Sequence, residues 1–169
     1  AAMAQRLASA GKLAGLTEPE ILALAAAMSY VGIEAEAGGT AMTQTLSAIE
    51  KAVVKGGDNL NEFARIAGMS AEQFAQSWRT TPVDAVQAFL NGLGKLESQG
   101  ESATLVLDKM GLSGVRQSNM LKSLALASEQ VAGAVALSNK AWLENTALTK
   151  EAQLRYSTTE SRLKLLNNS

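Results

Sequence analysis

The sequence contains no cysteine and no histidine among its 169 residues. Without cysteine the chain can form no disulfide and no thiolate metal site. Without histidine it lacks the commonest metal ligand and the commonest general base, so a Ser-His-Asp triad is impossible within this span. These absences weigh against an enzyme, and we expect no catalytic, cofactor-binding or metal-binding residues.

Aromatic residues are also scarce, at 4% of the chain, and there are only two prolines. The hydrophobic fraction is nevertheless 47%, which is enough for a folded domain with a buried core. Much of this fraction is alanine, a residue that favours helix but fills little volume. We therefore expect thin helices that approach one another closely.

The charges are balanced, with 15 Lys and Arg against 16 Asp and Glu, and the two signs are interspersed. This pattern lacks the basic patch that marks a nucleic-acid or anionic-membrane surface. The longest strongly apolar run without a charge covers residues 21–33, which is too short to span a bilayer. We expect a buried helix there and no transmembrane segment in this span.

A triplet of glycine, an apolar residue and a hydroxyl residue occurs three times, at 15–17, 68–70 and 111–113. The glycine suits the left-handed position that ends a helix, and the serine or threonine can cap the next helix. Glu20 and Gln73 complete a capping box in the first two copies, whereas the third copy has no such partner. The triplets therefore predict three helix boundaries, with Thr17, Ser70 and Ser113 as caps.

Apolar residues recur with the helical period along the whole chain, and we find no strand-like alternation. We expect Gly38 and Gly39 to break the helical pattern and Thr40 to restart it. Asn59 with Glu62 predicts a further capping box. The expected helices cover about 3–11, 18–31, 40–55, 59–67, 71–79, 82–100, 102–110 and 114–126.

No glycine follows Gly133 and no proline follows Pro82, so residues from Ser128 onward predict one long helix to about Leu166. Leu143, Leu154 and Leu165 recur every eleven residues, the period of a straight or slightly right-handed helical assembly. Charged neighbours indicate a solvated rod whose leucine seam can pair with another copy of the chain. The predicted fold is all-α: a compact cluster of short helices in a domain of residues 1–127, then one long, coiled-coil-like helix over 128–169.

The large side chains in the middle of the chain lie on helical stripes that face one another. We expect these residues to form the main core between about 40 and 100. A platform for stacking nucleic-acid bases would need basic residues between the rings, which are missing here. The predicted core residues are Phe63, Phe74, Trp78, Phe89 and Leu93.

Two other features could suggest chemistry, and both have simpler interpretations. Glu34 and Glu36 resemble a carboxylate pair but have no cationic or histidine partner nearby, which favours a solvated helix end. The glycine-rich stretches at 38–43 and 55–59 lack the spacing of a phosphate-binding loop and follow no strand, which favours turns.

Three elements occur in order between residues 32 and 96: a glutamate before a Gly-Thr turn, "FARIAGMSAEQFAQSW" and "PVDAVQAFLNGL". In this order and spacing they resemble the conserved core domain of phage tail tape measure proteins of the lactococcal-siphophage type. The similarity continues over 107–125 and 147–168. The residues that carry the motif are Glu36, Gly39, Thr40, Phe63, Gly68, Ser70, Phe74, Trp78, Pro82 and Phe89.

The resemblance implies a structural protein of a bacteriophage or prophage that takes part in virion tail assembly. Such a protein sets tail length, occupies the tail lumen and leaves before DNA delivery, after assembly in the bacterial host cytoplasm. The leucine seam predicts a homo-oligomer, and the resemblance implies contacts with the tail tube protein and tail assembly chaperones. Tape measures are usually several times longer, so we expect this chain to be a piece of one.

Two other function classes remain open. The alanine-rich residues 21–33 permit a membrane-active or pore-forming helical module of a phage or secreted protein, which a vesicle-leakage assay would detect. A lytic enzyme domain is disfavoured by the missing histidine and cysteine and by the lack of a convincing carboxylate pair.

Overall fold

The structure, a computed structural model, describes residues 2–141, 143–145 and 148. These residues form helices and connecting loops without any strand, which confirms the all-α prediction for the described part of the chain. The elements are α1 Ala2–Leu13, α2 Glu18–Tyr30, α3 Ala35–Lys55, α4 Asp58–Ala67, α5 Ala71–Thr80, α6 Pro82–Leu96, the 3-10 turn η1 Glu97–Gln99, α7 Ala103–Lys109, α8 Val115–Leu126 and a C-terminal helix, Ser128–Asn145.

The capping boxes predicted at Thr17 and Ser70 are present. At the start of α2, Glu20 N–H donates to Thr17 Oγ1 at 3.3 Å and Thr17 N–H donates to Glu20 Oε1 at 2.9 Å. At the start of α5, Ser70 and Gln73 make the same reciprocal pair at 3.1 and 3.0 Å. Each cap contributes about 1 kcal/mol, so these pairs define where α2 and α5 begin.

The glycines of the three triplets all end helices in the left-handed conformation, with φ of 90°, 74° and 76°. The apolar residue after each glycine donates its N–H to the carbonyl five residues earlier, as in a Schellman motif. These bonds are Leu16 to Gly11 at 2.8 Å, Met69 to Ala64 at 2.9 Å and Leu112 to Leu107 at 2.8 Å. The prediction that the triplets end helices is confirmed.

The expected helix break at Gly38 and Gly39 is wrong, because α3 runs through both residues. The glycines permit contact with α1: a Cβ on Gly39 would lie 2.7 Å from Arg6 Cβ, and one on Gly38 would lie 2.9 Å from Met3 Cε. Glycine weakens an isolated helix, but here it lets two helices approach closely. Tertiary packing therefore overrides the local preference.

Two expected caps are also wrong. Asn59 lies inside the first turn of α4, which begins after Gly57 and has no side-chain cap. Ser113 precedes the true boundary of α8, which begins after Gly114, again without a side-chain cap. Gly57 has a φ of 81°, a conformation that glycine adopts readily. The chain therefore turns into α4 at the backbone of Gly57, and not through a side-chain cap on Asn59.

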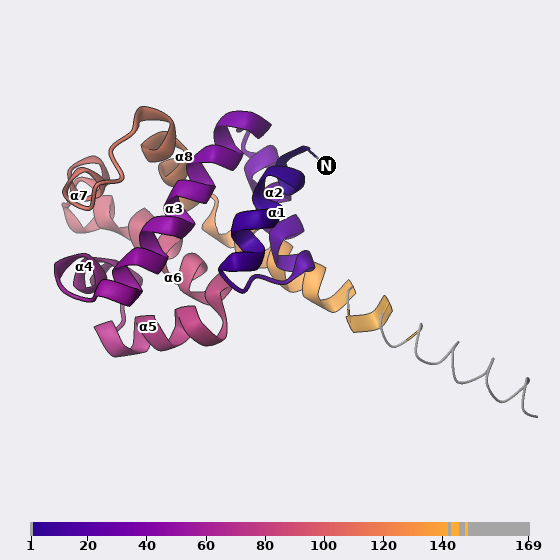
Figure 1. Cartoon of the computed structure of the whole chain (residues 1–169). Helices are drawn as coiled ribbons and strands as arrows, with labels where there is room; N and C mark the ends of the chain where they lie inside the picture. The colour runs from indigo at the N-terminus through magenta and orange to yellow at the C-terminus, as the bar shows by residue number, and fades with distance from the viewer. Residues whose placement is uncertain (1, 142, 146–147, 149–169) are drawn as a thin grey trace, which may run out of the picture.

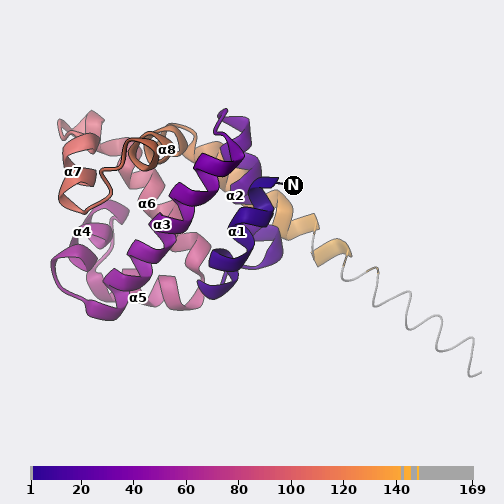
Figure 2. The same ribbon diagram turned by 45° about the horizontal axis from the view of Figure 1, so that its top comes forward.

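Helix α3 is the longest of the labelled helices and runs across the cluster (Figures 1 and 2). Helices α1 and α2 lie toward one end of it and α4 and α5 toward the other, while α6 lies behind. Helix α6 packs against α4, α5 and α8, and α3 packs against α1 and α8. The two helices α3 and α6 therefore organise the cluster.

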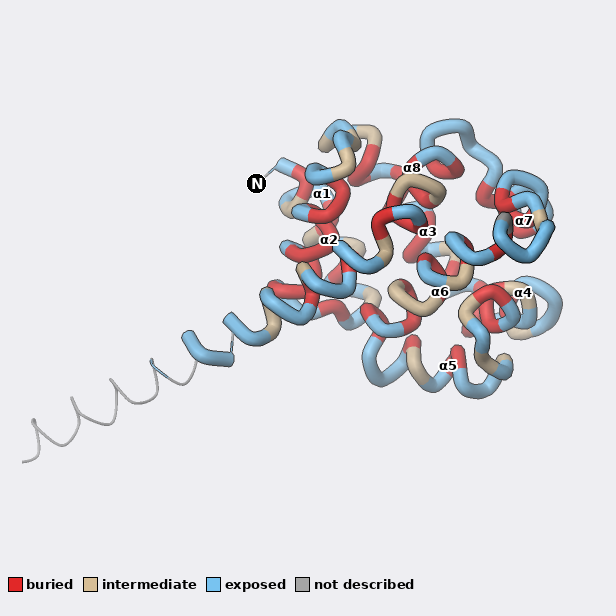
Figure 3. The backbone as a smooth tube through the Cα atoms, turned by 180° about the vertical axis from the view of Figure 1, so that it is seen from behind, coloured by how far each residue is buried: buried red, intermediate tan, exposed pale blue. Residues whose placement is uncertain are grey.

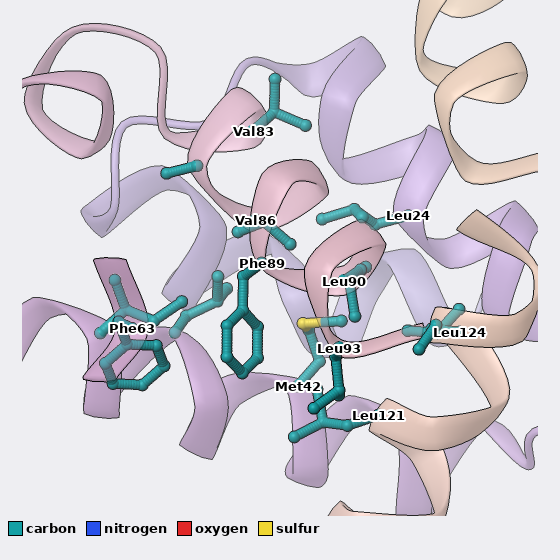
Figure 4. Close-up of a cluster of buried hydrophobic side chains, with 14 of the residues drawn as sticks. Leu24, Met42, Phe63, Val83, Val86, Phe89, Leu90, Leu93, Leu121 and Leu124 are labelled. Atoms are coloured by element: carbon teal, nitrogen blue, oxygen red, sulfur yellow. The ribbon is translucent and has the colours of Figure 1, made fainter. Parts of the chain in front are cut away.

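The core prediction for residues 40 to 100 is confirmed. The five side chains are 0–2% exposed. The Phe63 ring stacks on Phe74 with centroids 5.9 Å apart and meets Phe89 at 5.0 Å. In Figure 4, Phe89 lies between Phe63 and the α6 leucines Leu90 and Leu93, which continue the core toward Met42 and Leu124. Aromatic and aliphatic side chains thus form one continuous core.

The single long helix expected over 128–169 is not shown. The C-terminal helix meets α8 at a 77° bend and is described as far as Asn145. Val131 and Val135 belong to the core of the cluster, so the first turns of this helix are packed although residue 127 was the expected domain boundary. The helix then leaves the cluster on the side of α1 and α2 (Figures 1 and 3). Leu154 and Leu165 lie outside the described residues.

A matched pair of glycine substitutions tests the close packing of helices. We expect Gly92→Ala to destabilise the fold by about 1–3 kcal/mol or more, because the Cβ of the new alanine would overlap the carbonyl oxygen of Ile66 in α4. Gly133→Ala, whose Cβ meets nothing within 4 Å, should raise stability by up to about 1 kcal/mol. Urea unfolding measures both. Equal effects of the two substitutions would contradict this packing.

The aromatic core makes a second prediction. Trp78→Ala should reduce the free energy of unfolding by about 3–5 kcal/mol, since the side chain is 2% exposed. Trp78→Phe should lose less, because most of the packing remains. Thermal melting followed by circular dichroism separates the two variants, and an unchanged melting temperature for Trp78→Ala would show that this packing is wrong.

Candidate functional site

The residues that carry the resemblance to tape measure proteins do not converge on one site. Phe63, Phe74, Trp78, Phe89 and Pro82 are buried in the packing, and Gly68 and Ser70 form the α4–α5 turn. Glu36 and Thr40 lie exposed near the start of α3, while Gly39 is buried against α1. Eight of the ten residues therefore serve packing or a turn, whereas Glu36 and Thr40 are exposed on α3.

Two polar contacts join distant helices. The Trp78 indole N–H donates to Glu50 Oε2, which links α5 to α3. Gln117 in α8 donates to Thr45 Oγ1 at 3.0 Å, and Thr45 donates to the Ala41 carbonyl at 2.9 Å. Both Thr45 and Gln117 are buried, so the second contact satisfies polar atoms that would otherwise be costly inside the core.

Arg65 joins the end of α4 to the loop before α7. Its guanidinium lies 3.1 Å from a carboxylate oxygen of Glu62 and 3.1 Å from one of Glu101. The hydrogen bond from Arg65 lowers the pKa of Glu62, and the two carboxylates raise the pKa of Arg65 further above its ordinary value. The three side chains are 33–45% exposed, so the cluster is a surface clamp.

An open groove of about 550 Å³ lies between α1 and α3. Its apolar lining comes from Ala10, Leu13, Leu46 and Val54, and Leu13 and Val54 are 87% and 72% exposed. The rim carries charged side chains: Arg6, Glu50, Lys51 and Lys55. Within the described residues, none of the three cations forms an ion pair. This "α1–α3 groove" is an exposed apolar surface with a charged border.

The C-terminal helix carries a second exposed apolar surface. Leu137 and Leu143 are 69% and 68% exposed, although the same helix buries Val131 and Val135. Leu143 belongs to the seam expected from the sequence, whereas Leu137 was not part of that prediction. Leu137, Leu13 and Val54 share one signal in the sequence: each is an apolar residue that lies away from the buried apolar stripe of its own helix.

The Arg65 clamp makes a pH-dependent prediction. The pKa of Glu62 is lower in the folded protein than in the unfolded chain. The ionised Glu62 side chain therefore stabilises the fold fully when the pH is above the ordinary glutamate pKa, and this stabilisation is lost as the pH falls through the lowered pKa. Arg65→Met should therefore cost up to about 1 kcal/mol at neutral pH and less below about pH 4. Urea unfolding at both pH values measures the change.

Arg79→Met is the matched control, because Arg79 is exposed and forms no ion pair in the described part of the chain. We expect no pH-dependent change from it. A loss from Arg65→Met that is the same at both pH values would contradict an ionic role for the clamp.

Within the described residues, no group of three or more acidic, cysteine or histidine side chains could hold a metal ion. No single described helix is long and apolar enough to cross a membrane. Among the helices in the described part of the chain, only α8 together with the C-terminal helix meets such limits of length and composition, and these two are bent by 77°. No family model, curated protein or solved structure matches the chain.

Proposed function

We propose that this chain is a structural segment of a phage or prophage tail tape measure protein. In this role it occupies the lumen of the tail tube before DNA ejection and contributes to tail length. It works in the virion tail after assembly in the bacterial cytoplasm. Its partners are further copies of itself, the tail tube protein and the tail assembly chaperones.

The observation that carries the proposal is a helix that leaves a packed cluster with its leucines exposed. The C-terminal helix is anchored by Val131 and Val135 and then exposes Leu137 and Leu143. The extent of such a helix increases by 1.5 Å per residue, which is the property that a molecular ruler needs. The resemblance of residues 32–96 to tape measure proteins supplies the connection to a tail.

The proposed ruler predicts that tail length follows helix length. Deleting residues 146–167, two of the eleven-residue repeats, in the protein that contains this chain should shorten the tail by about 33 Å or the nearest whole ring of tube subunits. Electron microscopy of assembled tails measures the change.

Duplication of the same residues is the matched control and should lengthen the tail by a similar amount. Tails of unchanged length and normal assembly would reject this segment as part of the ruler. Complete loss of tails in both variants would reject the ruler in favour of a role in starting assembly.

A membrane-active module is the second candidate, because α8 and the C-terminal helix together have the length and composition of a membrane span, although they are bent by 77°. Among the alanine-rich residues that first suggested this function, the large side chains Ile21, Leu24 and Met28 of α2 are buried in the cluster. Membrane insertion would therefore require the cluster to open. Leakage of a dye from lipid vesicles on addition of the protein would favour this function over the structural one.

A further inference from the structure

We propose that the α1–α3 groove of one copy binds the C-terminal helix of a second copy, head to tail. The inference rests on the self-association named in the proposed function, and it requires no phage tail. It differs from pairing of two leucine seams, because the two contacting surfaces are different parts of the chain.

The exposed face of the C-terminal helix has the shape that a groove requires. Leu137 and Leu143 lie about 120° apart around the helix axis, opposite the buried Val131 and Val135. Helical spacing places Gly133 and Ala136 between the two leucines, and both are exposed. The helix therefore presents two apolar edges, with the small residues between them toward its base and the charged Lys140 and Glu144 between them farther out.

The groove offers a matching surface. Its α1 side contributes Ala10 and Leu13, and its α3 side contributes Leu46 and Val54. Small residues on both surfaces permit close approach of the helix, as they do within the cluster. The leucines of the helix would cover Leu13 and Val54, which are otherwise exposed.

The charges also have partners across this contact. Lys140 and Glu144 are exposed and lie one turn apart between the two leucines. The groove rim carries one anion, Glu50, and three cations, Arg6, Lys51 and Lys55. Because both surfaces bear charges of both signs, an incoming helix can place each charge near its opposite, which favours one orientation over the reverse.

Each copy has one groove and one protruding helix, so this contact is heterologous. When two copies bind in this way, the pair still has one free groove at one end and one free helix at the other. Further copies can bind there, so a heterologous contact extends into a filament or closes into a ring. Pairing of two leucine seams would instead use the same surface twice and close as a dimer. This difference makes the proposal testable by mixing two defective variants.

The groove variant is Leu13→Glu with Val54→Glu, and the helix variant is Leu137→Glu with Leu143→Glu. All four residues are at least 68% exposed, so the fold should persist, which circular dichroism verifies. If the double groove variant melts early, Val54→Glu alone replaces it. Leu22→Glu with Leu105→Glu is the matched control, since these leucines are exposed on α2 and α7.

Size-exclusion chromatography with light scattering measures the mass of each sample. We expect the wild type and the control to gain mass with concentration. Each defective variant alone should remain a monomer, with association weakened roughly tenfold or more. An equimolar mixture of the two variants should form a complex of two chains, because one supplies an intact helix and the other an intact groove.

Three results would overturn the proposal. The wild type could stay monomeric at all concentrations, the groove variant could self-associate as well as the wild type, or the mixture could remain monomeric. The second result would identify the leucine seams as the contact. None of these results depends on tail length, so failure here is distinguishable from failure of the proposed function.

Discussion

The close approach of helices with small side chains is the constraint on which the rest of the structure depends. With aromatics at 4% and alanine abundant, the chain fills space by bringing backbones together. A glycine lies at each of four helix contacts, where an added Cβ would come within 3.0 Å of a neighbouring element. These glycines are Gly11 between α1 and α2, Gly39 between α1 and α3, Gly92 between α4 and α6, and Gly94 between α6 and α8.

Helix α6 shows how far this constraint reaches. Gly92 admits the carbonyl of Ile66 from α4, and Gly94 admits the carbonyl of Ala125 from α8. The two contacts hold α4 and α8 against α6. The aromatic stack around Phe63 and the base of the C-terminal helix, which follows α8, therefore both take their positions from the backbone of α6.

Local rules predict much of this fold because capping and periodicity act within a few residues. The boxes at Thr17 and Ser70 and the buried stripe through Phe89 and Leu93 were predictable for that reason. The interpretation failed at Gly38 and Gly39, where the deciding contact is with α1, more than thirty residues away. A glycine pair that breaks one helix and a pair that admits another helix look the same in sequence.

The candidate site was less predictable than the core, since it depends on surfaces that meet only after folding. Leu13 and Val54 are single apolar residues away from the main stripes, and the α1–α3 contact is what places them around one groove. The polar links are equally hidden, because Trp78 reaches Glu50 across 28 residues and Gln117 reaches Thr45 across 72. Leu143 was identified because it belongs to a periodic series, which is a local signal.

The base of the C-terminal helix connects the packing to the proposed role. Val131 and Val135 anchor the helix in the core at a 77° bend from α8, so the direction in which it leaves is defined relative to the groove on α1 and α3. In a head-to-tail assembly, the distance between successive clusters depends on where along this helix the next groove binds. Moving that point by one turn changes the spacing by about 5.4 Å and keeps a similar face toward the groove. A chain of copies could then set a length through the placement of leucines along the helix, with the clusters acting as the joints between segments.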